Sequence, residues 1–114
     1  MPTLFMVELA VADPAASRTW YEATLGMKVE TVDASTGFVL LQDGRGGRLA
    51  LKPGTPNRGG VTLHFEVADV DAAVQGLRPD GPAVDSPEGY REAFVRDPDG
   101  YRVGLFAWVR PGAT

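Results

Sequence analysis

A short run of residues that occurs twice decides the fold of this chain. Residues 7–13 read VELAVAD and residues 63–69 read LHFEVAD, so both runs are largely apolar and close on Val-Ala-Asp. A second pair of matching segments begins at Asp43 and Asp97, where Gly, Arg, an aliphatic residue, a small residue and Leu follow at identical offsets. Two matches in the same order indicate a duplicated module of roughly 50 residues, which is the signature of an internal repeat.

Each half of the chain is predicted to form a strand, a helix and three further strands. Residues 4–12 and 61–68 have the composition and partial alternation of strands. Asp13 stands directly before Pro14, and this pair favours the start of a helix that ends at Gly26. The other strands are expected at residues 27–34, 37–42, 48–52, 82–86, 91–96 and 101–109.

The second helix is predicted to begin at Asp69, which precedes apolar residues at helical spacing. This stripe runs from Val70 to Leu77, before a Pro-Asp-Gly-Pro segment that ends the helix. In the first helix, Trp20 and Tyr21 belong to the apolar stripe, and we interpret both as core residues.

The repeat predicts one α+β domain, residues 1–114, made of module 1 (about 1–53) and module 2 (about 60–110). The segment 53–60 is rich in Gly and Pro and is interpreted as the linker between the modules. Each βαβββ module leaves a curved mixed sheet with one unburied face. We therefore expect the two sheets to enclose a cavity, with the functional site on their inner faces.

Composition narrows the functional class. The formal net charge is −4 and the basic residues are scattered, which argues against a nucleic-acid partner. There is no cysteine, no apolar stretch of membrane-spanning length and no signal-peptide pattern at the start of the sequence. We expect a cytoplasmic protein without a membrane partner, whose chemistry uses neither a thiolate nucleophile nor a thiolate metal ligand.

The duplicated pattern resembles the vicinal oxygen chelate superfamily, which includes glyoxalase I, bleomycin-resistance proteins, fosfomycin-resistance enzymes and extradiol dioxygenases. The matching motifs are Val-Ala-Asp-Pro at 11–14, Trp-Tyr at 20–21, Leu-Gly at 25–26 and Asp-Pro-Asp-Gly-Tyr at 97–101. The resemblance covers nearly the whole chain and implies the fold. It does not select a reaction, because the family contains isomerases, transferases, dioxygenases and binding proteins.

The resemblance also identifies the strand positions at which metal enzymes of this family hold their ion. These positions are occupied here by Met6, Ala50, Thr62 and Gly104. None of the four is a His, Glu or Gln ligand, and Met and Thr are poor partners for the divalent ions concerned. We therefore expect no metal site and no cofactor.

Alternation along a strand places residues of equal parity on one face. If the four positions above face the cavity, so do Ala10, Glu66, Arg102 and the remaining members of the predicted site. The predicted ligand-binding set is Met6, Glu8, Arg48, Ala50, Lys52, Thr62, His64, Gly104, Phe106 and Trp108.

Glu8 and His64 are the candidate catalytic residues, because they occupy equivalent positions in the two modules and a pseudo-twofold axis would bring them together. His64 is the only histidine. We favour a cavity-wall role for it over a ligand-contacting or general-base role, with metal ligation third. For Glu8 we favour a partly solvated or ion-paired carboxylate over a base or ligand anchor.

The aromatic residues Phe38, Phe94, Tyr101, Phe106 and Trp108 are interpreted mostly as core. Phe106 and Trp108 in a cavity wall would nevertheless suit stacking on a planar or cationic ligand.

The favoured interpretation is a metal-independent small-molecule binding protein of the glyoxalase/bleomycin-resistance type. Its expected role is the sequestration of a drug or metabolite whose identity the sequence does not give. The alternative is a lyase or isomerase that uses Glu8 and His64, with or without a non-standard divalent metal site. A third class is an accessory module with a filled, inactive cavity. We also expect a homodimer, because pairing would protect the edge strands.

Overall fold

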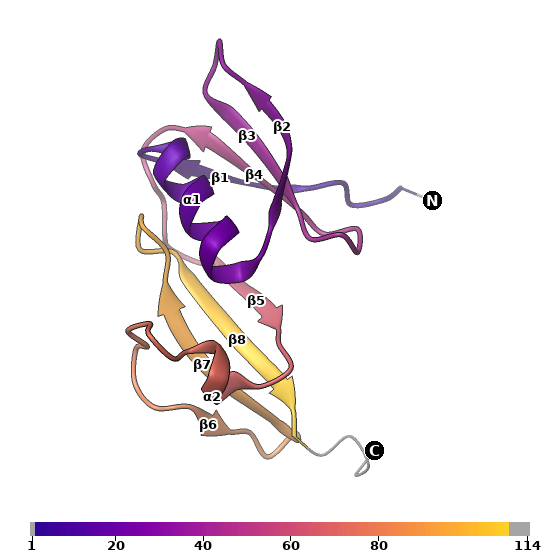
Figure 1. Ribbon diagram of the computed structural model, residues 1–114, viewed down its shortest axis with the longest axis vertical. Coiled ribbons are helices and arrows are strands. Elements are labelled where there is room, and N and C mark those ends of the chain that lie inside the picture. The colour runs from indigo at the N-terminus through magenta and orange to yellow at the C-terminus, as the bar shows by residue number, and fades with distance from the viewer. Residues whose placement is uncertain (1, 110–114) are drawn as a thin grey trace. The chain divides into compact units, whose positions relative to one another are not determined.

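The computed structural model describes residues 2–109. The chain divides into two compact units, residues 1–57 and 58–114, and the boundary falls within the Gly- and Pro-rich segment 53–60 (Figure 1). Each unit follows the order strand, helix and three strands. The predicted α+β class and the duplicated βαβββ pattern are therefore confirmed.

The first unit contains a four-stranded mixed sheet in the order β1-β4-β3-β2, in which only the β1–β4 pair is parallel. Its elements are β1 (Val7–Val11), α1 (Pro14–Leu25), β2 (Lys28–Asp33), β3 (Phe38–Gln42) and β4 (Arg48–Pro53).

The second unit repeats this topology, with the order β5-β8-β7-β6 and a parallel β5–β8 pair. Its elements are β5 (Thr62–Glu66), α2 (Val70–Ala73), β6 (Val84–Asp85), β7 (Tyr90–Arg96) and β8 (Arg102–Trp108).

The ends of α1 are those that the sequence predicts. The Asp13 carboxylate accepts hydrogen bonds from the backbone N–H groups of Ala15 and Ala16, at 3.0 and 3.3 Å. These bonds satisfy donors that a helix N-terminus otherwise leaves without partners. At the other end Gly26 adopts φ 69°, a left-handed conformation that suits glycine.

The second helix is shorter than predicted. Asp69 caps it through a 3.2 Å bond from the Ala72 N–H, but α2 ends at Ala73 and does not extend to Leu77. Beyond Ala73 the backbone forms hydrogen bonds that span three residues instead of four, such as Leu77 N–H to Val74 O at 3.0 Å. Gly76 adopts φ 80°. Because a left-handed glycine cannot continue an α-helix, the apolar stripe ends in turns.

Several strands are also shorter than predicted, among them β5, which covers Thr62–Glu66 of the expected 61–68. The first strand begins at Val7 and not at residue 4, and the exposed side chains of Leu4 and Phe5 precede it. The strand expected at 82–86 is reduced to the two residues of β6, since prolines at 82 and 87 lack the N–H that a longer ladder requires.

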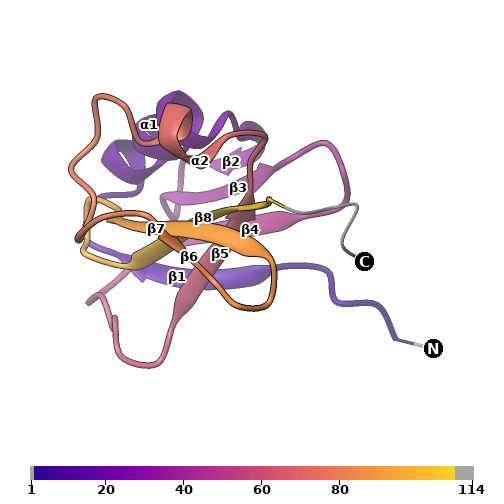
Figure 2. The same cartoon turned by 90° about the horizontal axis from the view of Figure 1, so that it is seen from below.

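Each helix lies on one face of its own sheet (Figures 1 and 2). In the first unit Tyr21 of α1 is fully buried with Leu9, Val11 and Leu51 of the sheet. In the second unit α2 places Val70 against Ala93 and Ala107. Along β8, Val103 and Leu105 are buried, whereas Arg102 and Trp108 are exposed. The odd-numbered side chains of β8 therefore form the core, and the even-numbered ones lie on the face that α2 leaves open.

Candidate functional site

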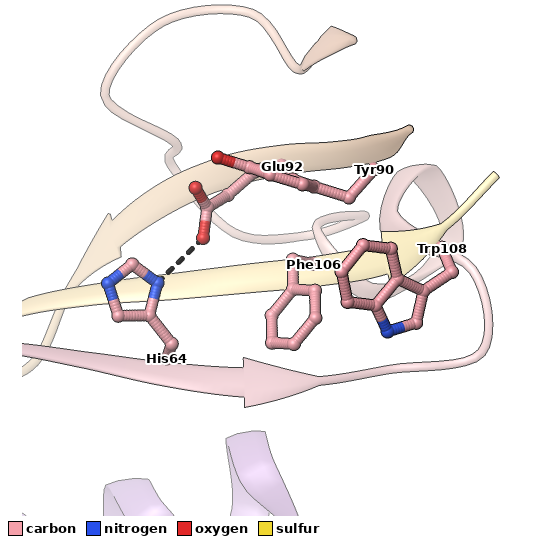
Figure 3. A pocket seen from close by; sticks show the side chains of 5 residues that line it. All are labelled: His64, Tyr90, Glu92, Phe106 and Trp108. Atoms are coloured by element: carbon pink, nitrogen blue, oxygen red, sulfur yellow. Dashed lines mark hydrogen bonds and ion pairs between the residues drawn. The ribbon is translucent and has the colours of Figure 1, made fainter. Parts of the chain in front are cut away.

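A groove lies on the face of the second sheet opposite α2. It has a cavity volume of about 260 Å³ and is lined by His64, Tyr90, Glu92, Phe106 and Trp108 (Figure 3). Strand alternation produces this set, because all five residues are even-numbered members of β5, β7 and β8. Cross-strand register completes it, since Tyr90 pairs with Trp108 and Glu92 with Phe106.

Three aromatic rings form most of the groove wall. The ring centroids of Tyr90 and Phe106 are 6.2 Å apart, and each lies 5.9 Å from the centroid of Trp108. The three ring planes are nearly perpendicular to one another, with interplanar angles of 76°, 86° and 89°. Trp108 is 53 % exposed, so this cluster is open to a ligand.

The polar wall of the groove is an imidazole–carboxylate pair. His64 Nδ1 lies 2.7 Å from Glu92 Oε2, and the side chains are 51 % and 12 % exposed. An ionised carboxylate only accepts hydrogen bonds, so Nδ1 carries the proton in this contact. The bond orients the ring, and the second nitrogen, Nε2, points away from the aromatic side chains (Figure 3).

Gly104 makes room for this pair. A Cβ atom at Gly104 would lie 2.7 Å from Glu92 Oε2, 2.9 Å from His64 Nδ1 and 3.0 Å from Phe94 Cε1. Real Cβ atoms do not approach other atoms so closely, and the position therefore accepts a side chain only if its neighbours move. The absence of a side chain at Gly104 thus leaves space for the His64–Glu92 contact, and Gly104 is not among the residues that line the groove.

The other predicted residues of the second unit lie beside the groove. Thr62 is half-buried and pairs in register with Arg102, whose guanidinium carbon lies 3.6 Å from the ring centroid of Phe94. Phe94 and Phe106 are half-buried and Tyr101 is buried, as a mostly core role predicts. For Trp108, at the end of β8, the core interpretation is wrong, because 53 % of the residue is exposed.

Four of the five predicted residues of the first unit lie on its own sheet, and Met6 directly precedes β1. Ala50 is fully buried, Met6 is half-buried, and Glu8 and Lys52 are exposed. Arg48, the fifth of these residues, donates from Nε to Glu30 at 3.0 Å. Its guanidinium carbon lies 4.5 Å from the ring centroid of Phe5. A pairing of Glu8 with His64 stays a prediction, and so does a ligand-binding role for these five residues.

Sequence reasoning missed Glu92 and Tyr90. The strand predicted at 91–96 already contained the signal for Glu92, because its even parity places it on the same face as Phe94. Tyr90 lay just outside that predicted strand. Their alignment with Phe106 and Trp108 depends on the β7–β8 register, which the repeat pattern did not provide.

The positions at which metal enzymes of the resembled family hold an ion do not fit one here. Met6, Ala50, Thr62 and Gly104 supply no imidazole or carboxylate. Within residues 2–109, no group of three or more His, Cys, Asp or Glu side chains could hold a metal ion. No helix in this described range is long and apolar enough to cross a membrane.

Comparison with known proteins identifies the family. The family model described as Glyoxalase/Bleomycin resistance protein/Dioxygenase superfamily matches residues 3–105. The chain belongs to this superfamily. No curated protein matches the sequence significantly.

Several solved structures share the fold. A protein of unknown function from Agrobacterium tumefaciens is 26 % identical, covers 94 % of both chains and has a TM-score of 0.78. A glyoxalase/bleomycin resistance protein/dioxygenase from Nocardioides is 23 % identical, with 98 % of this chain and 87 % of that chain covered and a TM-score of 0.77. The antibiotic binding protein TnmS3 from a Streptomyces species is 24 % identical, with 94 % and 96 % covered and a TM-score of 0.77.

Proposed function

We propose that this superfamily member binds an organic small molecule in the groove of the second sheet, without a metal ion. The observation that carries the proposal is the cluster of Tyr90, Phe106 and Trp108 around an open cavity. Large aromatic side chains contribute most when they are buried, and an exposed tryptophan beside a cavity is typical of a binding site. TnmS3, which has the same fold, is described as an antibiotic binding protein.

The size of the groove limits the ligand. Ligand pockets for drug-sized molecules usually have volumes of about 300–1,000 Å³, and the groove measures about 260 Å³. It therefore accepts a small molecule or one planar portion of a larger one. Sequestration of a drug or metabolite is the function that this arrangement supports best.

Tryptophan fluorescence tests the proposal. The chain has two tryptophans, and Trp20 lies on α1 with its ring 4.9 Å from that of Tyr21 and is not among the residues that line the groove. The Trp20→Phe variant makes Trp108 the only reporter. We expect saturable quenching by small planar aromatic compounds, with no consumption of the compound over hours.

The matched variants separate the site from the rest of the fold. Trp108→Ala should abolish binding measured by calorimetry, whereas Trp20→Phe should bind as the unaltered chain does. Equal affinities in Trp108→Ala and the unaltered chain would exclude the groove as the site.

A second candidate function is proton transfer by His64, in an isomerase or lyase. The 2.7 Å contact with Glu92 favours it, because a carboxylate that accepts from Nδ1 leaves Nε2 available as a base when the ring is neutral. The test is exchange of carbon-bound hydrogen of a bound compound with deuterium from solvent, followed by NMR. Exchange that persists in His64→Ala would remove His64 from this role.

We further propose that the protein is a cytoplasmic homodimer. Each sheet, taken by itself, ends in strands with one unpaired edge, and association would pair or cover such edges. Light scattering on the purified chain tests this, since a mass of one chain at all concentrations contradicts it.

A further inference from the structure

The aromatic wall of the groove consists of three rings that pack edge to face. Tyr90, Phe106 and Trp108 present planes at 76–89° to one another, and their centroids are 5.9–6.2 Å apart. A cation in the adjoining cavity can lie within the roughly 6 Å over which it is attracted to a ring, because the three ring centres are so close together. The same three residues line one cavity, so this space is available.

Carboxylates flank the floor of this space on both sides. Phe106 pairs in register with Glu66 on β5 and with Glu92 on β7, so the three residues form one row across the sheet. Adjacent strands are about 4.8 Å apart, so both acidic residues neighbour Phe106 in this row. The Glu92 carboxylate is turned toward His64 (Figure 3). Glu66 is exposed and has no ion-pair partner within the described part of the second unit.

The basic residues of this sheet are already paired or lie away from the aromatic wall. His64 lines the groove and contacts Glu92 at 2.7 Å, and Arg96 of β7 contacts Asp80 at 2.6 Å. Arg91 lies on the opposite face, where its guanidinium binds Asp71 at 3.0 Å and Asp85 at 3.1 Å. Arg102 shares the face of the groove but lies four positions from Phe106, about 13 Å along the strand. Its guanidinium is already stacked on Phe94.

We propose that the groove selects ligands that carry a methylated ammonium group or another weakly hydrated organic cation. This inference rests on the proposed binding function. Ring faces and two carboxylates together favour positive charge, while the apolar wall disfavours a compact, strongly hydrated ammonium that would have to shed its water. The net charge of −4 adds weak attraction for cations over the whole molecule.

A pair of probes with nearly the same shape tests the inference. Choline and 3,3-dimethylbutan-1-ol differ in that a carbon atom replaces the charged nitrogen, so the alcohol is neutral. Ligand-observed NMR titration of each against the full chain gives the two dissociation constants. We expect choline to bind at least about ten-fold more tightly, since each favourable cation–ring contact is worth about two-fold or more.

Two variants test the mechanism. Trp108→Leu keeps apolar bulk but removes a ring face, and it should weaken choline about two- to five-fold while weakening the alcohol by a smaller factor. Glu66→Gln should weaken choline at low salt, with the difference shrinking as salt is added. Melting curves verify that each variant folds, and Tyr90→Leu replaces Trp108→Leu if the latter does not fold.

The outcomes separate this inference from the proposed function. Equal or tighter binding of the neutral alcohol overturns the cation preference. If 1-naphthol binds in the groove and choline does not, the cation preference is overturned and the binding function stands. If choline, the alcohol and 1-naphthol all fail to bind, both are overturned.

Discussion

Replacing Gly104 by alanine should open the contact between His64 and Glu92 without unfolding the protein. The new methyl carbon would lie 2.7 Å from Glu92 Oε2 and 2.9 Å from His64 Nδ1. To reach ordinary van der Waals separation, these atoms must move by about 0.5–0.7 Å. Glu92 is mostly buried, whereas half of the His64 side chain is exposed, so the imidazole is the group that is free to turn outward.

The effect on stability should be moderate because two terms oppose each other. Loss of the bond from His64 leaves the mostly buried Glu92 carboxylate without that donor, which costs about 1–3 kcal/mol. Alanine in place of glycine lowers the entropy of the unfolded chain and offsets about 0.4–1 kcal/mol. We therefore expect the free energy of unfolding, measured in urea, to fall by no more than about 2.5 kcal/mol.

NMR of the imidazole nitrogens measures the contact directly, because His64 is the only histidine. In Gly104→Ala we expect Nδ1 to lose the signature of a hydrogen bond to carboxylate. Gly54→Ala is the matched control, since its added Cβ would meet only Ala10 Cβ at 3.4 Å, an ordinary contact. That variant should leave the His64 spectrum unchanged.

Two results would refute this reasoning. An unchanged His64 spectrum in Gly104→Ala would mean that the methyl group is accommodated without moving the pair. A loss of more than about 3 kcal/mol would mean that the backbone of β8, and not the side chains above it, absorbs the clash.

Three further predictions concern the fold. Leu41→Ala should lower the free energy of unfolding by about 2–5 kcal/mol, because Leu41 is fully buried in β3; a loss below 1 kcal/mol in urea would contradict the packing. Asp13→Ala should cost about 1 kcal/mol by removing the cap of α1, and an unchanged midpoint in thermal melting would count against the cap. Hydrogen bonds from Ser35 lower the pKa of Asp33 in the folded state. This carboxylate therefore adds stability above its unfolded pKa of about 3.9 that is lost as pH falls through the lower, folded pKa. Asp33→Asn should flatten the acid side of the stability–pH profile, and parallel profiles would refute the assignment.

The two helices show how far local sequence predicts structure. For α1, the Asp13–Pro14 start and the Gly26 stop act within one turn of the chain, and the structure has both. For α2, the apolar stripe out to Leu77 had the correct period, yet the chain turns after Ala73 because Gly76 adopts a left-handed conformation. A stripe of apolar residues indicates which side chains face the core, and turns can satisfy that requirement as well as a helix does.

The candidate site, unlike the ends of α1, depends on residues that are far apart in the sequence. Parity along β5 and β8 placed His64, Phe106 and Trp108 on one face. Their partners Tyr90 and Glu92 come from β7, and a shift of one residue in its pairing would have turned both to the other face. The turn at 97–101 fixes that register, because the Asp97 N–H donates to Tyr101 O at 3.0 Å and closes the β7–β8 hairpin. The sequence shows the turn motif but not the cross-strand pairs that follow from it.

The sequence by itself determined the duplicated module, the order of its elements, the cap and stop of α1, and the superfamily. These features are encoded by repeat spacing, alternation and short capping motifs, which act between neighbours in the chain. Only the tertiary structure decided that His64 binds Glu92, that Gly104 makes room for this pair, and that three aromatic rings meet at right angles. The physical reason is that each of these contacts joins separate strands, so it depends on cross-strand register and on the space left between side chains.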